Sequence, residues 1–346
     1  MSRLTKADAL EMLKTASLPS LGKEADAAVQ KRYPGNVRTY NVERNINYTN
    51  VCVSQCRFCA FCRNETDPDA YVLDHATLLQ KTAETVELGG RQILLQGGLH
   101  PSLPLEWYEN ILRTIKEHFP SVNIHGFSPT EIVYFADQFH LPEKTVLKRL
   151  RSAGLGSLPG GGAEILVDRV RQIVSPNKAS ADRWLNVCRI WHQLGGRSSA
   201  TMMFGQIETV QERLEHLDKL RDLQDETGGF TAFIPWTFQP GNTKLADRRK
   251  TSSAEYLRFL AVSRLFLDNF PTIQSSWVTQ GLPIGTLGLS FGANDLGSIM
   301  IEENVVAAAG TVFRSTEAAF CESIKAAGYE PQRRGSGKNG GKIFGK

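Results

Sequence analysis

The chain has 346 residues, of which 41% are hydrophobic and 22% are charged, so it can form one large α/β barrel or two ordinary domains. Its net charge of +4 is too small to argue for nucleic acid as a partner. No run of eighteen apolar residues predicts a membrane span, and the first residues lack the apolar core of a secretory signal, so we expect a cytoplasmic protein.

Residues 1–39 predict a short helical extension. Thr5 is placed to cap a helix whose apolar positions begin at Ala9, and a second helical piece covers residues 23–31. The sequence Tyr-Pro-Gly that follows this piece ends it.

From residue 40 onward, short apolar runs suited to buried parallel strands alternate with longer segments of helical period. Predicted strands cover residues 40–48, 91–96, 122–127, 156–158, 198–204, 229–233, 272–277 and 287–291. Predicted helices between them cover residues 75–88, 105–119, 143–153, 179–194, 209–225, 252–269 and 302–309. About eight β–α units predict an α/β fold of the TIM-type (β/α)8 barrel class over residues 40–330, with an open doubly wound sheet as the alternative.

Residues 331–346 are rich in Gly, Arg and Lys and nearly devoid of large apolar side chains. This composition predicts a basic flexible tail. The tail is short and has no alternation of aromatic residues, so a solvated end is a better interpretation than contact with nucleic acid or an anionic membrane.

Four of the six cysteines fall between positions 52 and 62, directly after the first predicted barrel strand. In a reducing compartment such crowding indicates metal binding rather than disulfides. Cys52, Cys56 and Cys59 have the spacing C-x3-C-x2-C, and Phe58 precedes the third cysteine. Three thiolates on one short loop can hold three irons of a 4Fe–4S cluster and leave the fourth iron open to another ligand.

The cysteine segment also has other interpretations. Cys56, Cys59 and Cys62 fit a ferredoxin-like C-x2-C-x2-C run, although no Cys-Pro ligand follows it. Structural zinc normally uses two separated pairs of ligands, and no second pair occurs downstream. Cys188 and Cys321 fall in helical patterns and fit small buried apolar positions.

The C-x3-C-x-Phe-Cys loop after the first strand resembles the signature of the radical S-adenosylmethionine superfamily. The resemblance implies a 4Fe–4S cluster on Cys52, Cys56 and Cys59, with S-adenosylmethionine chelated by the open iron. It also implies a one-electron reductant such as flavodoxin or ferredoxin. A non-catalytic iron–sulfur electron carrier or a zinc-stabilised binding protein is the alternative of a different class.

The same resemblance implies further cofactor-binding positions. Gln96, Gly97 and Gly98 end the second predicted strand, where a glycine pair lets the backbone approach the amino group of S-adenosylmethionine; a plain turn is the alternative. Glu164 follows three glycines and can accept ribose hydroxyls, or it lies at a helix start. Arg171 could meet the methionine carboxylate, with a solvent-facing arginine as the alternative, and Met203 lies in a stretch that resembles the family's adenine-packing element. Further cofactor-binding candidates are Phe58, which would shield the cluster, Ser128, and Cys62, which stands where related proteins usually carry an aromatic residue.

From about residue 40 to residue 311 the chain resembles the dehypoxanthine futalosine cyclases, also called cyclic dehypoxanthinyl futalosine synthases, of the futalosine route to menaquinone. The matching stretches include NYTNVCVSQCRFCAF at residues 47–61, GLGSLPGGGAEILVDRVR at 154–171 and FGANDLGSIMIEENVVAAAGT at 291–311. Residues 234–240 and 276–280 favour this family over aminofutalosine synthase, the nearest alternative radical enzyme. The resemblance implies that a 5′-deoxyadenosyl radical removes the ribose C4′ hydrogen of dehypoxanthine futalosine, and that the carbon radical then closes a spirocycle on the benzoate ring.

Polar side chains at or after the predicted strand ends are expected to bind the substrate, because barrel active sites are built there. The reaction also needs a proton acceptor, and His100, His125 and Asp295 are equivalent candidates in the sequence. Trp236 is expected to shield the radical from water, with core filling as the alternative. The remaining candidates are Gln239, Thr279 and Asn294.

Overall fold

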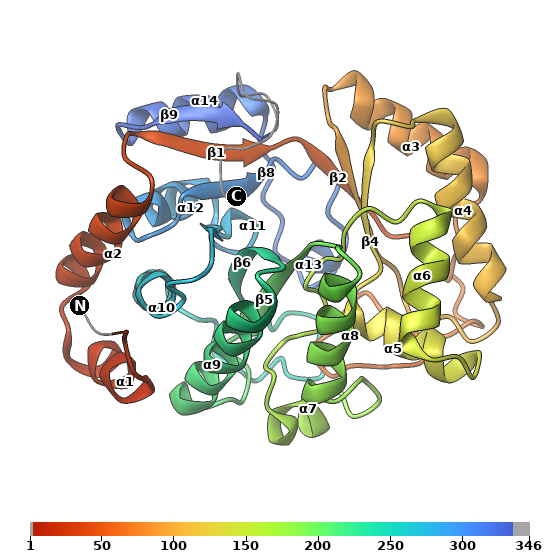
Figure 1. Ribbon diagram of the computed structural model, residues 1–346, viewed down its shortest axis with the longest axis horizontal. Coiled ribbons are helices and arrows are strands. Elements are labelled where there is room, and N and C mark those ends of the chain that lie inside the picture. The colour runs from red at the N-terminus through yellow and green to blue at the C-terminus, as the bar shows by residue number, and fades with distance from the viewer. Residues whose placement is uncertain (1–2, 335–346) are drawn as a thin grey trace.

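The structure, a computed structural model, describes residues 3–334 and is built around parallel strands (Figure 1). The strands form three sheets with the orders β8-β1-β9, β2-β3-β4 and β5-β6-β7. Their bounds are β1 Val37–Asn41, β2 Glu43–Ile46, β3 Gln92–Leu95, β4 Asn123–Gly126, β5 Ser198–Phe204, β6 Phe230–Thr237, β7 Thr272–Ile273, β8 Asp295–Ser298 and β9 Glu330–Arg333.

Single parallel bridges join the three sheets into a closed ring. Ser157 pairs with His125 of β4 and Leu158 pairs with Ser198 of β5, so residues 157–158 occupy the fourth barrel position. A bridge from Gln274 to Asp295 joins the end of β7 to β8. β1 and β2 are consecutive strands separated by one residue, with β1 paired to β8 and β2 paired to β3. The ring therefore has eight positions, which confirms the TIM-type barrel and rejects the open sheet.

Helices cover the outer face of this ring (Figure 1). Their first turns are capped by short polar side chains: Asp74, Ser128, Ser180, Thr209 and Ser252 each accept a hydrogen bond from a backbone N–H of the helix they precede. The principal outer helices are α3 His75–Glu87, α4 Leu105–His118, α5 Pro129–Gln138, α6 Glu143–Ala153, α7 Asp168–Val174, α8 Ala181–Gln193, α9 Val210–Thr227 and α10 Ser253–Phe266.

The apolar core lies between the ring and its helices in two clusters. One is centred on Trp184, Phe230 and Phe233, and the other on Tyr108 and Phe127. Because these clusters fill the layer outside the strands, the fold does not depend on apolar packing along the barrel axis, and the interior remains available for polar groups.

Several expected elements differ from the observed ones. Residues 287–291 do not form a strand, because they end α12 (Leu282–Leu287) and continue as a 3-10 turn (Gly288–Ser290) that buries Leu289. The eighth strand is β8, whose sequence Asp-Leu-Gly-Ser has no apolar run to reveal it. The prediction also missed α5, α7, α11 (Trp277–Gln280), α12 and α14 (Glu317–Ala326), and it extended the helix at α13 (Val305–Ala308).

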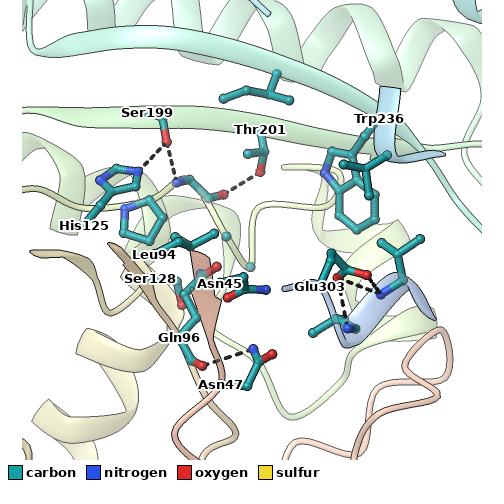
Figure 2. A pocket seen from close by; sticks show the side chains of 18 of the residues that line it. Asn45, Asn47, Leu94, Gln96, His125, Ser128, Ser199, Thr201, Trp236 and Glu303 are labelled. Carbon is teal, nitrogen blue, oxygen red and sulfur yellow. Dashed lines mark hydrogen bonds between the residues drawn. The ribbon is translucent and has the colours of Figure 1, made fainter. Parts of the chain in front are cut away.

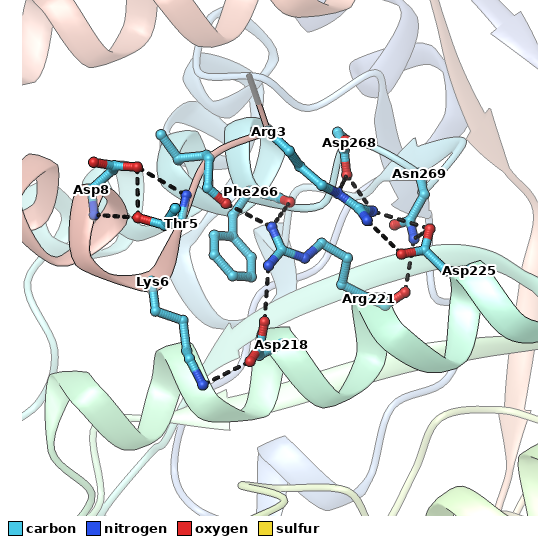
Figure 3. A network of polar contacts seen from close by, with 11 residues as sticks. Arg3, Thr5, Lys6, Asp8, Asp218, Arg221, Asp225, Phe266, Asp268 and Asn269 are labelled. Atoms are coloured by element: carbon cyan, nitrogen blue, oxygen red, sulfur yellow. Dashed lines mark hydrogen bonds and ion pairs between the residues drawn. The ribbon is translucent and has the colours of Figure 1, made fainter. Parts of the chain in front are cut away.

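The N-terminal extension forms α1 (Lys6–Thr15) and α2 (Leu18–Arg32) and packs on the barrel helices α9 and α10. Thr5 caps α1 as expected, in a reciprocal capping box with Asp8. Arg3 forms ion pairs with Asp225 at 2.5 Å and with Asp268 at 2.8 Å, which fasten the start of the chain to α9 and to the residues after α10 (Figure 3).

The expected flexible tail begins too early in the sequence. Glu330–Arg333 forms β9, which pairs with β1 in parallel register from Val37↔Glu330 to Tyr40↔Arg333. Strand pairing needs only backbone groups, so the polar composition of this segment gave no signal for it. Residues 335–346 lie outside the described part of the chain. Within residues 3–334, no helix has the length and apolarity that a membrane crossing requires.

Candidate active site

A cavity of about 710 Å³ occupies the interior of the barrel. The cysteine loop borders one end, and side chains from successive strands line its length (Figure 2). The expected site residues that line it are Cys52, Cys56, Phe58, Cys59, Cys62, Gln96, Gly97, Gly98, His125, Ser128, Glu164, Trp236 and Thr279.

Backbone hydrogen bonds hold the cysteine loop over the cavity. The N–H of Val53 donates to the carbonyl oxygen of Leu99 at 3.0 Å, and the N–H of Arg57 donates to that of Val174 at 2.8 Å. The three cysteines of the C-x3-C-x2-C motif therefore face one enclosed space from one loop. This donor set fits a 4Fe–4S cluster with an open fourth iron, because each thiolate then binds a different iron. In residues 3–334 no three His, Cys, Asp or Glu side chains are grouped to hold a single metal ion.

Cys62 lies beside Cys52. Its thiol donates to the carbonyl oxygen of Cys52 at 3.2 Å. A hydrogen bond from Cys62 also lowers the pKa of Cys52 to about 6, whereas burial raises the pKa values of Cys56 and Cys59. The fourth cysteine is thus positioned to stabilise the Cys52 thiolate through a hydrogen bond.

The glycine pair allows the cysteine loop to pack against the end of β3. A Cβ atom on Gly98 would lie 2.0 Å from the carbonyl oxygen of Val51, and one on Gly97 would lie 2.5 Å from the Tyr48 ring. The Tyr48 hydroxyl donates to Glu131 at 2.7 Å, and Glu131 forms a capping box with Ser128 at the start of α5. The glycines are therefore required by close packing under the loop, whatever they contact in the cavity.

A buried ion pair lies next to the cysteine loop. Lys178 Nζ is 2.7 Å from Glu164 Oε1 and 5.0 Å from the centre of the Phe58 ring. Glu164 has a φ of 40°, a left-handed backbone conformation for a residue other than glycine. Lys178 lines the cavity and no sequence pattern singled it out.

Arg171 and Met203, which the sequence placed near the cofactor, do not line the cavity. The Arg171 guanidinium is buried and donates to the carbonyl oxygens of Gly162, Ala163 and Ala179. Those hydrogen bonds bind the guanidinium to the backbone of the loop that carries Glu164. Met203 packs in the apolar core outside the ring.

His125 lies within the barrel on β4, where Nδ1 is 2.7 Å from Ser157 Oγ and Nε2 is 3.3 Å from Ser199 Oγ (Figure 2). Burial lowers the pKa of His125 to about 3, so the ring is neutral near pH 7. Of the three side chains expected to accept a proton, only His125 lines the cavity.

Four other expected residues do not line the cavity and form hydrogen bonds with neighbouring residues instead. His100 Nδ1 accepts the N–H of Ser102. Gln239 bonds Thr237 and Thr311. The Asn294 side chain accepts hydrogen bonds from the buried Arg264 at 2.6 Å and from the N–H of Ile273. Asp295 is fully buried and accepts hydrogen bonds from Thr39 and the N–H of Gly297.

Arg334 brings a cation to the opposite end of the cavity from the cysteine loop. It follows β9, and its Nε lies 3.1 Å from Asp295 Oδ2. It lines the cavity together with Glu43 of β2 and Gln92 of β3, at the amino ends of the barrel strands. Among residues 3–334 its two terminal guanidinium nitrogens have no hydrogen-bond partner. The sequence gives no sign of this role for Arg334, because the composition around it predicts a flexible tail.

Comparison with known proteins agrees with this site. Residues 46–220 match the model of the radical SAM superfamily, and residues 227–339 match the CofH/MqnC C-terminal region. The chain is 46% identical to a cyclic dehypoxanthine futalosine synthase of Streptomyces coelicolor over 96% of this chain and 84% of that protein. It is 44% identical to a protein of the same name from Halalkalibacterium halodurans, over 96% of this chain and 90% of that protein. The crystal structure of methylornithine synthase (PylB) superposes with a TM-score of 0.74 at 20% identity, over 96% of this chain and 95% of that one.

The barrel and its cysteine loop define a radical S-adenosylmethionine enzyme, a class that uses a 4Fe–4S cluster and S-adenosylmethionine. Within this superfamily, the chain belongs to the family of the cyclic dehypoxanthine futalosine synthases.

Single substitutions of the four clustered cysteines should distinguish the three cluster ligands from Cys62, which only neighbours them. We expect Cys52→Ala, Cys56→Ala and Cys59→Ala each to lose most of the iron and sulfide bound after anaerobic reconstitution, because each removes one of three ligands. Cys62→Ala should keep the cluster, since only a hydrogen bond to Cys52 is lost. Iron and sulfide analysis with visible absorbance measures this, with Cys321→Ala as the control. Loss of the cluster in Cys62→Ala alone would reassign the ligand set.

Proposed function

We propose that this protein catalyses the radical cyclisation of dehypoxanthine futalosine to cyclic dehypoxanthine futalosine, a step of menaquinone biosynthesis. The proposal is carried by one observation: an enclosed barrel cavity has three motif cysteines at one end, in a chain 46% identical to a protein named for this product. When bound, the 4Fe–4S cluster and S-adenosylmethionine supply the 5′-deoxyadenosyl radical that removes the ribose C4′ hydrogen. A one-electron reductant such as flavodoxin or ferredoxin provides the electron.

Lys178 and Glu164 are the residues that would hold S-adenosylmethionine beside the cluster. Both side chains line the cavity near the cysteine loop, and the carboxylate can accept ribose hydroxyls. The Lys178 side chain is largely buried, which by itself lowers its pKa, but neighbouring negative groups raise the pKa overall, so the ammonium remains charged and can bind the methionine carboxylate. Lys178 thereby takes the role that the sequence suggested for Arg171, whose guanidinium is already bound by backbone carbonyls.

Replacing Lys178 should weaken cofactor binding without removing the cluster. We expect Lys178→Met to raise the dissociation constant of S-adenosylmethionine by about tenfold or more, since a charge-assisted hydrogen bond contributes roughly 1.5–3 kcal/mol. Lys178→Arg should recover part of the affinity because it retains the charge. Equilibrium dialysis of the reconstituted protein measures binding directly. Unchanged affinity in Lys178→Met, with normal iron content, would exclude this role.

The middle of the cavity suits a substrate that combines a sugar with an aromatic ring. Leu94, Ile234 and Trp236 offer apolar surface, while Asn45 and Thr201 offer hydrogen-bonding groups (Figure 2). Cyclisation requires the ring to lie against ribose C4′ with water excluded, so that the carbon radical attacks the ring and no other partner. Loss of one proton, and of one electron for which the oxidised cluster would be the acceptor, then gives a product two hydrogens lighter than the substrate. His125 lies on the cavity wall, but burial lowers its pKa to about 3, which makes it a weak acceptor for that proton near pH 7.

Arg334 binds the benzoate carboxylate at the far end of the cavity. Its terminal nitrogens are free of hydrogen bonds within the described residues and can donate to a carboxylate in a bidentate manner. Asp295 forms an ion pair with the guanidinium, 3.1 Å from an Nε that makes no hydrogen bond among residues 3–334, and Glu43, which also faces the site, has its pKa raised by burial. A neutral Glu43 would leave only Asp295 to oppose the incoming anion.

Removing the Arg334 charge should affect the substrate more than the cofactor. We expect Arg334→Gln to raise the KM for dehypoxanthine futalosine by about 10- to 100-fold, while the dissociation constant of S-adenosylmethionine stays unchanged. Arg333→Gln is the matched control, because the neighbouring Arg333 pairs with Glu317 outside the cavity. Equal effects of the two variants on KM would show that only the packing of β9 matters.

The function itself is tested under anaerobic conditions. The reconstituted, reduced protein is supplied with S-adenosylmethionine and dehypoxanthine futalosine, and products are followed by mass spectrometry. We expect one 5′-deoxyadenosine per cyclised product, with the product two hydrogens lighter than the substrate. Deoxyadenosine without this product would support another radical enzyme, such as an aminofutalosine synthase. No deoxyadenosine from a loaded, reduced cluster would reject radical chemistry and leave the electron-carrier hypothesis.

A further inference from the structure

The cysteine loop separates the cavity from solvent by a single layer of chain. From residue 53 to residue 57 exposure alternates: Val53, Gln55 and Arg57 are exposed, whereas Ser54 and Cys56 are buried. The cysteine side chains face the cavity, so the side chains between them form the outer surface. An electron that enters from this outer side has to cross only the loop itself.

Apolar side chains are exposed at this surface. Val53 retains 42% and Ile173 retains 39% of its accessible area. They lie on segments that are joined directly, because the N–H of Arg57 donates to the carbonyl oxygen of Val174. Together with flanking charges, such exposed apolar side chains can form the centre of a small contact with another molecule.

Exposed cations lie on segments that are bonded to the cysteine loop. The N–H of Lys244 donates to the carbonyl oxygen of Arg57 at 2.9 Å, which brings the loop after β6 against the cysteine loop. Both side chains are exposed, and neither forms an ion pair with any residue between 3 and 334. The same loop continues through a turn into three further exposed cations, Arg248, Arg249 and Lys250.

Acidic groups nearby cancel part of this charge. Within the basic loop Asp247 lies 3.8 Å from Arg248, and Glu255 pairs with Arg249 at 3.4 Å. On the other side of the cysteines Asp69 pairs with Arg63, whereas Glu65 keeps its negative charge beside the neutral Ser102. Within the part of the chain that the structure describes, Arg57 and Lys244 therefore remain without an acidic partner next to the thiols, while the whole chain carries only +4.

We propose that Val53, Arg57, Ile173 and Lys244 form the docking surface for a small acidic one-electron carrier protein of the flavodoxin or ferredoxin kind. The inference rests on the proposed function, which requires reduction of a cluster on these cysteines. Positive charge attracts and orients the acidic carrier, and the apolar residues form the centre of a small, transient contact. One electron passes from the reduced carrier to the cluster, and the oxidised carrier then dissociates.

The test compares two double variants that change the net charge equally. Arg57→Glu/Lys244→Glu alters the proposed surface, and Lys14→Glu/Lys31→Glu alters exposed positions on α1 and α2. The reconstituted full chain is mixed anaerobically with reduced flavodoxin at low ionic strength. Loss of the visible absorbance of the oxidised cluster gives the reduction rate, and titration calorimetry gives the flavodoxin affinity.

We expect the surface variant to lower the second-order rate of reduction by flavodoxin about tenfold or more, with a matching loss of affinity, and the α1/α2 variant to change neither. Photoreduction by neutral 5-deazariboflavin, which needs no docking site, should reduce all three proteins equally. The wild-type rate with flavodoxin should fall with added salt. Arg57→Gln/Lys244→Gln should give an intermediate loss and guards against a defect specific to the added carboxylates.

An unchanged flavodoxin rate in the surface variant, or an equal loss in the α1/α2 variant, would overturn the docking proposal. Neither result would affect the cyclase assignment, because photoreduced protein can be assayed for cyclised product without any carrier. A failure of cyclisation with normal flavodoxin-dependent reduction would instead reject the substrate and retain the docking surface.

Discussion

The site depends on how closely the end of β3 can approach the cysteine loop. At Gly98 a single Cβ atom would meet the carbonyl oxygen of Val51 at 2.0 Å, one residue before the first motif cysteine. Below it, the Tyr48 hydroxyl is bonded to Glu131, so the ring cannot move aside without breaking a buried hydrogen bond. The glycine pair therefore sets the distance between the cysteine loop and the end of β3. That distance in turn sets the position of any group bound between the loop and the barrel.

The two ends of the cavity carry cations of different kinds, and this division matches the two molecules the reaction requires. Lys178 stands beside the cysteine loop, and Arg334 stands at the amino ends of the strands. S-adenosylmethionine and dehypoxanthine futalosine each carry a carboxylate. Anchoring one at each end would leave their reacting parts, the deoxyadenosyl group and the ribose, to meet in the middle near His125 and Trp236. Two separated charges can thus set the alignment that a single cation could not.

The sequence predicted those parts of the molecule whose pattern is local. Cysteine spacing and the buried periodicity of β5 and α6 identified the loop and most of the barrel, with α6 matched at both ends. It missed β8 and β9, because both strands are polar and are held by backbone pairing. Lys178 and Arg334 were missed for a related reason. A cation gains a function when the fold buries it or directs it toward a cavity. The residues next to it in the sequence give no sign of that. Conversely, Asn294 and Arg171 looked available in the sequence, yet partners distant along the chain or backbone carbonyls already bind them.

The cysteine loop satisfies two requirements that normally conflict. The radical needs a dry enclosed space, whereas the electron that starts the reaction comes from another protein at the surface. A loop with alternating side chains meets both needs with one layer of backbone: Cys52 and Cys56 turn toward the cavity, and Val53 and Arg57 turn outward. A thicker cover would protect the cavity equally well but would lengthen the path of the electron. The exposed apolar and basic residues of the outer face are consistent with this arrangement, since a purely structural loop would have no need to leave them uncovered and unpaired.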